Sequence, residues 1–214
     1  MCSIIGSFNK EVIEYLVNEN KYRGEFSFSI TKVDPETYTT ETYKKFCKFD
    51  NNYFNQVYEK RFYYLIHMQA PTIGLVKDPD RIHPIKYNDY KLLHNGVLKQ
   101  KWVDKQKKKD KIDSNFDTLH LITYLANTDL PLQKALEEID GSYVCVLIKE
   151  KKFIKVFRND SSIIHYKGTD LSSHKVKGMK SLPSFKIFNL DLKNRELKEE
   201  SDFNSINKPF FFTN

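Results

Sequence analysis

The sequence lacks the features that mark secreted, disulfide-stapled or membrane-spanning proteins. Its three cysteines, Cys2, Cys47 and Cys145, form no CxxC pair, which argues against a disulfide framework and against a zinc ribbon. The short apolar start has no basic segment and so does not resemble a signal peptide. No apolar run reaches the roughly 20 residues that span a bilayer. We therefore expect a cytoplasmic protein that does not enter a membrane.

Motifs for bound metals and nucleotides are missing as well. The chain contains no HExxH sequence and, with only 7 glycines, no glycine-rich phosphate loop or ATP-binding fingerprint. His120 and His165 lie among apolar residues, and we interpret both as core or surface histidines and not as ligands. The sequence thus predicts neither a metal nor a cofactor.

Positive charge is concentrated in one stretch. The formal net charge is +7, and residues 99–111 hold seven lysines with a single aromatic residue, Trp102. Such a run is compatible with a contact to nucleic acid or to an acidic partner. A solvated loop is the more common interpretation, and nucleic-acid binding through stacking would need more aromatic residues among the lysines. We therefore do not expect nucleic acid as a partner.

The length of 214 residues fits one domain, which we place at 1–200, with a C-terminal tail at 201–214. Residues 34–60 are polar and aromatic and are expected to be helical after Pro35. A turn at Asn95-Gly96 is expected to break the strand at 92–98. Further strands are expected at 2–8, 26–31, 62–67, 143–148, 153–157, 163–166 and 185–190, and helices at 9–21, 117–126 and 131–139. This order predicts an α+β fold with mostly antiparallel sheets.

Cys2 is the first candidate for catalysis. A small residue after the initiator methionine is compatible with removal of Met1, which would leave Cys2 with both a thiol and a free α-amine. The amine has a pKa near 8 and could take the thiol proton directly or through water. An inert buried thiol is the competing interpretation.

His94-Asn95-Gly96 is the second candidate. Acyl transfer needs hydrogen-bond donors directed at the developing oxyanion. The Asn95 side-chain amide and the Gly96 N–H could supply two such donors, and a glycine lets the backbone approach closely. Asn-Gly is also a common hairpin turn, so this motif alone leaves both interpretations open.

Several short motifs occur in a fixed order along the chain, beginning at its first residues. They are Met1-Cys2-Ser3-Ile4-Ile5-Gly6, Tyr22-Arg23-Gly24, the block from His67 to Gly74, His83-Pro84, His94-Asn95-Gly96, Asp117-Thr118 and Gly141-Ser142-Tyr143. In this order they resemble the glutaminase domain of class II glutamine amidotransferases, the domain shared by glucosamine-6-phosphate synthase, phosphoribosylpyrophosphate amidotransferase and asparagine synthetase. The resemblance covers about residues 1–192.

The resemblance implies a four-layer αββα sandwich of the N-terminal-nucleophile hydrolase type. It implies hydrolysis of glutamine to glutamate and ammonia through a thioester on Cys2. It assigns Asn95 and Gly96 to the oxyanion hole, Asp117 to the α-ammonium group of the substrate and Thr72 to a substrate loop. The stretch 74–84 would be a loop that closes over glutamine, which fits the need to exclude water from the reaction.

Gln69 departs from the family pattern, in which an arginine holds the α-carboxylate of glutamine. A glutamine side chain offers a neutral amide in place of a charged bidentate fork. Loss of that ion pair costs on the order of 2–4 kcal/mol in binding, unless Arg81 or a nearby lysine replaces it. Gln69 is therefore a substrate-binding candidate that puts glutamine specificity in question.

These observations leave three hypotheses. The first is a stand-alone glutaminase domain that passes ammonia to a separate synthetase partner. The second is a related amidase that acts on another small amide. The third is a catalytically silent binding module that uses the basic stretch.

Overall fold

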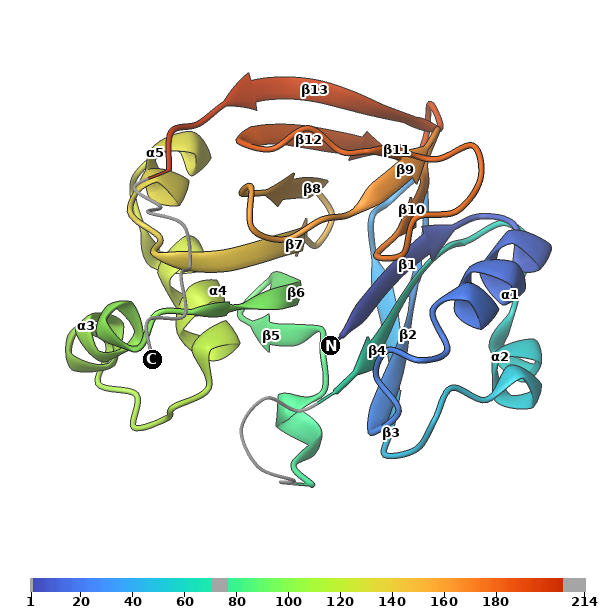
Figure 1. Ribbon diagram of the computed structural model, residues 1–214, viewed down its shortest axis with the longest axis horizontal. Helices are drawn as coiled ribbons and strands as arrows, with labels where there is room; N and C mark the ends of the chain where they lie inside the picture. The colour runs from blue at the N-terminus through green and yellow to red at the C-terminus, as the bar shows by residue number, and fades with distance from the viewer. Residues whose placement is uncertain (1, 71–76, 206–214) are drawn as a thin grey trace.

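Two antiparallel β-sheets lie face to face in the computed structural model, which describes residues 2–70 and 77–205 (Figure 1). The first sheet has the strand order β11 (Lys180–Ser181), β9 (His165–Lys167), β10 (Asp170–Ser172), β1 (Ser3–Ser7), β4 (Tyr63–Gln69), β2 (Ser27–Val33) and β3 (Thr40–Lys45). The second has the order β13 (Glu196–Asp202), β12 (Lys186–Asp191), β8 (Phe153–Arg158), β7 (Gly141–Lys149), β6 (Tyr90–Leu98) and β5 (Ile85–Tyr87).

Helices cover the outer face of each sheet (Figure 1). The helices α1 (Lys10–Glu19) and α2 (Asn51–Val57) pack on the first sheet. The helices α3 (Gln100–Asp110), α4 (Asp117–Asn127) and α5 (Leu132–Glu137) pack on the second. A short 3-10 helix, η1 (Pro79–Arg81), precedes β5. The layers are therefore helix, sheet, sheet and helix, and the αββα architecture predicted from the sequence is confirmed.

Three apolar cores hold these layers together. The core between the sheets joins Ile4 and Leu65 of the first sheet to Leu93 and Val146 of the second. The outer cores join helix to sheet, as where Leu16 of α1 packs with residues such as Phe28 and Ile66. Because β2 and β4 are covered on both faces, nearly all of their residues are buried. The alternation of Phe and Ser in 26–31 thus separates two buried faces, whereas the sequence had indicated a half-buried strand.

Three further local predictions are wrong. The segment 34–60 is not one helix, because Thr40–Lys45 pairs along its length with β2, as its β-favouring Thr and Tyr residues allow. Only Asn51–Val57 is helical, after Asp50 accepts hydrogen bonds from the first free N–H groups.

The lysine-rich stretch is the second correction, since Gln100–Asp110 forms a helix and not a loop. Lysine and glutamine favour helices, and Trp102, Val103 and Gln106 bury one side of α3. The lysines consequently lie mostly on the other side.

The third correction concerns the Asn95-Gly96 turn. Both residues lie within the continuous strand β6, opposite Val144 and Tyr143 of β7. Pairing with β7 over nine residues outweighs the local turn preference of the dipeptide.

The residues around the expected boundary at 200 lie in the second sheet and its core. Strand β13 runs to Asp202, past residue 200, and Phe203 is buried in the core under α3 to α5. All three cysteines are free thiols. In the parts of the chain that the structure describes, we find no helix with the length and apolar character needed to cross a bilayer.

Candidate active site

Cys2 lies at the start of β1, at one end of the space between the two sheets. Since Ile4 faces the core between the sheets, Cys2 two residues earlier faces the same side. Its Sγ lies 3.4 Å from the carbonyl oxygen of Ala70, just beyond β4. Burial raises the pKa of the Cys2 thiol, and the Ala70 contact and the Arg23 guanidinium oppose that shift. The sequence-predicted nucleophile is thus partly buried at the inner face of the sandwich.

The two sheets meet at the backbone carbonyl of Cys2. This oxygen accepts one hydrogen bond from Asn95 Nδ2 of β6, at 3.2 Å, and another from Arg23 Nε, at 3.1 Å. The turn that carries Arg23 lies close to β4 because Gly24 has no side chain: a Cβ there would lie 2.2 Å from the Met68 backbone. The structure therefore brings the Asn95 side chain directly to Cys2.

Gly96 follows Asn95 on the free edge of β6. Strand β5 pairs only with the first residues of β6, and within the described residues no strand pairs with the later ones on that edge. The carbonyl of His94 binds His67 there, and the N–H of Leu98 binds Asp117. Because alternate residues of a strand direct their backbone groups to the same edge, the Gly96 N–H points to this edge too. A Cβ on Gly96 would lie 2.0 Å from the Ser142 carbonyl oxygen, so only glycine fits.

Asp117 opens α4 beside the end of β6. Its Oδ2 accepts the Leu98 N–H at 3.0 Å, and its Oδ1 accepts the Thr118 N–H at 2.7 Å. Its charge acts to raise the pKa of the Cys2 thiol, which places the two residues in one electrostatic environment. One end of the molecule therefore brings together Cys2, Asn95, Gly96 and Asp117. The first and last of these are 115 positions apart in the sequence.

A cluster of three buried histidines lies behind these residues, and the sequence did not reveal it as a unit. The rings of His67 and His83 stack with centroids 4.3 Å apart, and Thr118 Oγ1 contacts both His83 and His94. Burial lowers the pKa of His67 to about 3 and that of His83 well below its usual value. Burial also lowers the pKa of His94, although Asp117 opposes that shift. All three rings are therefore neutral near pH 7.

Arg23 is a further residue whose role the sequence did not indicate. It belongs to the Tyr22-Arg23-Gly24 motif that carried the resemblance, and the motif itself suggested no contact. Burial lowers the pKa of its guanidinium. The signal that could have identified it is the glycine next to it, since a glycine after an arginine permits close approach to a neighbouring strand.

Gln69 lies on the inner face of β4, across from Ser27 of β2. Its Oε1 accepts a hydrogen bond from the Ser27 hydroxyl at 3.3 Å. Arg81, the proposed substitute for the missing arginine, lies 3.6 Å from Asp78 and over the ring of Phe116. Thr72, and the loop at 74–84 as far as residue 76, lie outside the described residues.

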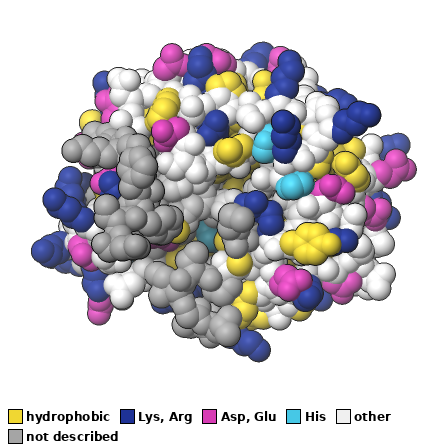
Figure 2. All heavy atoms as spheres, in the orientation of Figure 1, with side chains coloured by type: hydrophobic (Ala, Val, Ile, Leu, Met, Phe, Trp, Pro, Cys, Tyr) yellow, Lys and Arg dark blue, Asp and Glu magenta, His cyan; other side chains and the backbone are white. Residues whose placement is uncertain are grey.

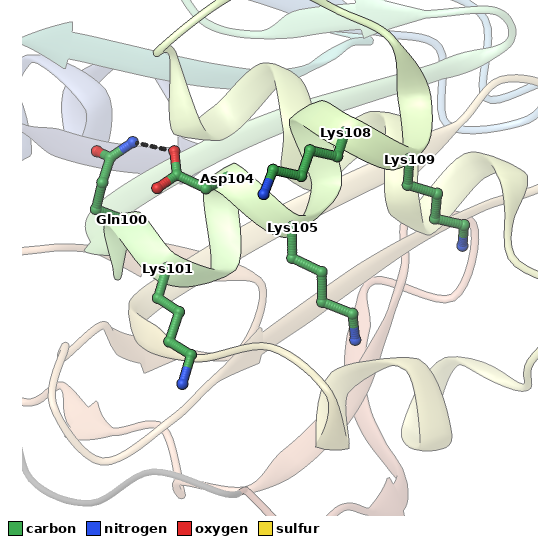
Figure 3. Close-up of a pocket in the computed structure, with 6 residues that line it drawn as sticks. All are labelled: Gln100, Lys101, Asp104, Lys105, Lys108 and Lys109. Atoms are coloured by element: carbon green, nitrogen blue, oxygen red, sulfur yellow. Dashed lines mark hydrogen bonds between the residues drawn. The ribbon is translucent and has the colours of Figure 1, made fainter.

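The lysines of α3 form a separate surface. Lys101, Lys105, Lys108 and Lys109 border an open hollow of about 720 Å³ together with a Gln100–Asp104 hydrogen bond (Figure 3). Figure 2 shows basic side chains at the edge of the molecule over this helix. Within the described residues no group of three His, Cys, Asp or Glu side chains could hold a metal ion.

Comparison with solved structures identifies the fold. A glutamine phosphoribosylpyrophosphate amidotransferase from B. subtilis, solved in complex with ADP and GMP, matches with a TM-score of 0.67 over 97% of this chain. The chain has a glutamine amidotransferase fold. The sequence identity is 16%, and the match covers 50% of the solved enzyme, so the chain spans about half of its length. No protein-family model and no curated protein sequence matches the chain.

The glutamine amidotransferase fold confirms the resemblance at the level of architecture. It also confirms the expected α+β sandwich with antiparallel sheets. The match ties the arrangement of strands to an enzyme of known type, whereas the roles of individual residues in this chain follow from their own geometry.

Proposed function

We propose that this chain is a glutaminase domain of the class II glutamine amidotransferase type, with Cys2 as its N-terminal nucleophile after removal of Met1. The observation that carries the proposal is the 3.2 Å hydrogen bond from the Asn95 side chain to Cys2, at the one end of the sandwich where Asp117 also lies. The shared fold of a solved glutamine amidotransferase supports it.

The proposed reaction has two steps. The Cys2 thiol attacks the side-chain amide carbon of glutamine, its proton passes to the freed α-amine, and then to the departing nitrogen, which leaves as ammonia. Water, deprotonated by the same amine, attacks the resulting thioester and releases glutamate and the thiol. A free thiol is needed throughout, so we place the reaction in a reducing compartment such as the cytoplasm.

Asn95 and Gly96 would stabilise the negative oxygen of each tetrahedral intermediate. The Asn95 amide has two N–H donors, and its bond to the Cys2 carbonyl uses one of them. The second donor and the Gly96 N–H would face the oxyanion. Asp117 would bind the α-ammonium group of glutamine, and Thr72 would contact the substrate from its loop.

We also propose that the ammonia goes to a synthetase acting in trans. The helices and strands of the described residues build the αββα sandwich, and the solved amidotransferase extends beyond the half that this chain matches. A synthetase partner that activates its own substrate would provide the acceptor site.

Gln69 favours a second candidate, hydrolysis of another small amide. The Ser27 hydroxyl already donates to its Oε1, and its side chain carries no charge for a substrate carboxylate. A panel that compares glutamine with amides lacking an α-carboxylate would distinguish the two. Better turnover of glutamine in Gln69→Arg than in the wild type would support weak carboxylate recognition in this chain.

Ammonia release from glutamine tests the main proposal. We expect Cys2→Ala to reduce the rate by on the order of 10³-fold or more, because the covalent route is lost. Cys47→Ala is the matched control, since Cys47 is an exposed thiol and should leave the rate unchanged. Equal activity of Cys2→Ala and the wild type would refute the proposal.

A further inference from the structure

Thr118 connects the two elements that carry the proposed site. Its Oγ1 lies 2.9 Å from His94 Nδ1 and 3.2 Å from His83 Nε2, and it is buried. In the sequence Thr118 directly follows Asp117 on α4, and His94 directly precedes Asn95 on β6. One hydroxyl therefore ties the start of α4 to the strand that bears the Asn95 and Gly96 donors.

The direction of these hydrogen bonds follows from counting protons. A threonine hydroxyl has one proton and two lone pairs. Its third neighbour, Asp117 Oδ1 at 3.4 Å, can only accept when the carboxylate is ionised. The hydroxyl satisfies all three neighbours if it donates to Asp117 and accepts from His94 Nδ1–H and His83 Nε2–H.

The rings of His67 and His83 agree with this assignment. His67 Nε2 lies 3.3 Å from the His94 carbonyl oxygen, which can only accept, so the His67 proton is on Nε2. His67 Nδ1 and His83 Nδ1 are buried without a hydrogen-bond partner among the described residues, whereas a hydrogen bond with the Ser142 backbone acts to raise the pKa of His94. With neutral rings, the free nitrogens of His67 and His83 are bare lone pairs.

We propose that Thr118 is a positioning residue that fixes the Asp117 carboxylate relative to the Asn95–Gly96 donor pair. This inference rests on the proposed function, in which Asp117 binds the substrate ammonium and Asn95 and Gly96 bind the oxyanion. The distance between those two groups has to match the length of the substrate. Two contacts set that distance. Thr118, next to Asp117 in the sequence, binds His94, and the N–H of Leu98 binds Asp117 Oδ2.

Steady-state kinetics with three variants test the inference. Thr118→Val keeps the shape of the side chain and removes the hydroxyl, whereas Thr118→Ser keeps the hydroxyl. Thr123→Val is the matched control, because Thr123 is also buried on α4 and its Oγ1 has no partner among the described residues.

We expect Thr118→Val to lower kcat/KM for glutamine by on the order of 10- to 100-fold, mostly through a higher KM, since Asp117 binds the substrate before reaction. Thr118→Ser should recover most of the loss, and Thr123→Val should match the wild type. Unchanged kinetics in Thr118→Val, or an equal loss in Thr118→Ser, would overturn the inference. In either case an active wild type that fails in Cys2→Ala would leave the proposed function intact.

Nitrogen NMR of the histidine rings gives a second readout that needs no activity. In the wild type we expect the ring protons on His94 Nδ1, His83 Nε2 and His67 Nε2. In Thr118→Val the His94 proton should leave Nδ1, which has lost its acceptor. A wild-type His94 protonated on Nε2 would contradict the assignment, and this readout decides the question if Thr118→Val does not fold. A wild-type protein with no amidase activity would instead overturn the proposed function.

Discussion

The same strands that build an apolar core at one end of the sandwich carry polar side chains at the other. On the inner face of β4, Tyr63 and Leu65 give way to His67 and Gln69. On β6, Leu93 is followed on the same face by Asn95. The change happens within two or three residues of each strand, and the polar ends of both strands lie at Cys2.

The strand β2 shows the same gradient. Its inward residues run from Val33 through Thr31 to Ser29 and Ser27, all buried. Ser29 Oγ has no hydrogen-bond partner among the described residues. A buried polar group without a partner costs about 1–3 kcal/mol, which an apolar residue would avoid. Buried polar residues that carry such a cost are expected more often at a functional site than in a core built for stability alone.

The largest expected effect comes from a substitution of Asn95, which lies at the centre of the polar end. Asn95→Asp keeps the shape of the side chain and replaces the donor amide with a negatively charged acceptor. We expect kcat for glutamine to fall by about 10²–10³-fold, with a smaller change in KM, because a donor to the oxyanion is lost. Asn127→Asp, on the exposed end of α4, is the control. A wild-type kcat in Asn95→Asp would show that Asn95 does not stabilise the oxyanion.

The second prediction compares the stability cost of adding a methyl group on β6 with the cost at an open position. Gly96→Ala forces a Cβ to 2.0 Å from the Ser142 carbonyl oxygen, so we expect a loss of about 3 kcal/mol in the free energy of unfolding. Gly168→Ala meets no atom within 4 Å and should cost only about 1 kcal/mol, from its positive φ. Urea unfolding of both variants measures the difference. Equal losses would show that β6 relaxes around the new methyl group.

The smallest effect for a single side chain is a dependence of stability on pH that arises at the polar end. Burial lowers the folded-state pKa of His67 to about 3 from 6.5, so the unfolded chain binds more protons between these values. Stability should therefore be complete above about pH 6.5 and fall below it, by about 1 kcal/mol per pH unit for each such histidine.

Two carboxyl groups with lowered pKa values titrate below this range, whereas burial raises the pKa of Asp170, so that its titration changes stability with the opposite sign. The pKa of Asp34 is lowered mainly by hydrogen bonds from Thr37 and Glu36, against the effect of its burial. The pKa of Asp191 is lowered by hydrogen bonds from Asn194. Both stabilise the fold above about pH 4 and lose that contribution only at lower pH. Urea unfolding of Asp170→Asn between pH 7 and 5 isolates the histidines, and a flat free energy of unfolding over that range would contradict their burial in neutral form.

The sequence predicted the helices and strands better than the contacts between side chains. The order of short motifs indicated the fold, and hydrophobic periodicity located most strands and helices. It missed β3, since Thr40–Lys45 is a strand only because β2 lies beside it, and it broke β6 at a dipeptide whose turn preference is overridden by β7.

The candidate site was predictable only in part, for the same reason. Cys2 and Asn95 could be selected from the motifs, because each residue type fits one chemical task. The bond of Thr118 to His94 and His83 depends on how α4 packs against β6, and no local pattern encodes that packing. Arg23 likewise gains its contact to Cys2 only when the turn before β2 meets β4.

Intact-mass measurement on a rapidly quenched reaction with glutamine examines the central claim most directly. The account predicts a protein that has lost Met1 and, during turnover, carries a glutamyl group that maps to the peptide beginning with Cys2. A fully active protein that retains Met1, or an acyl group on any other residue, would contradict it.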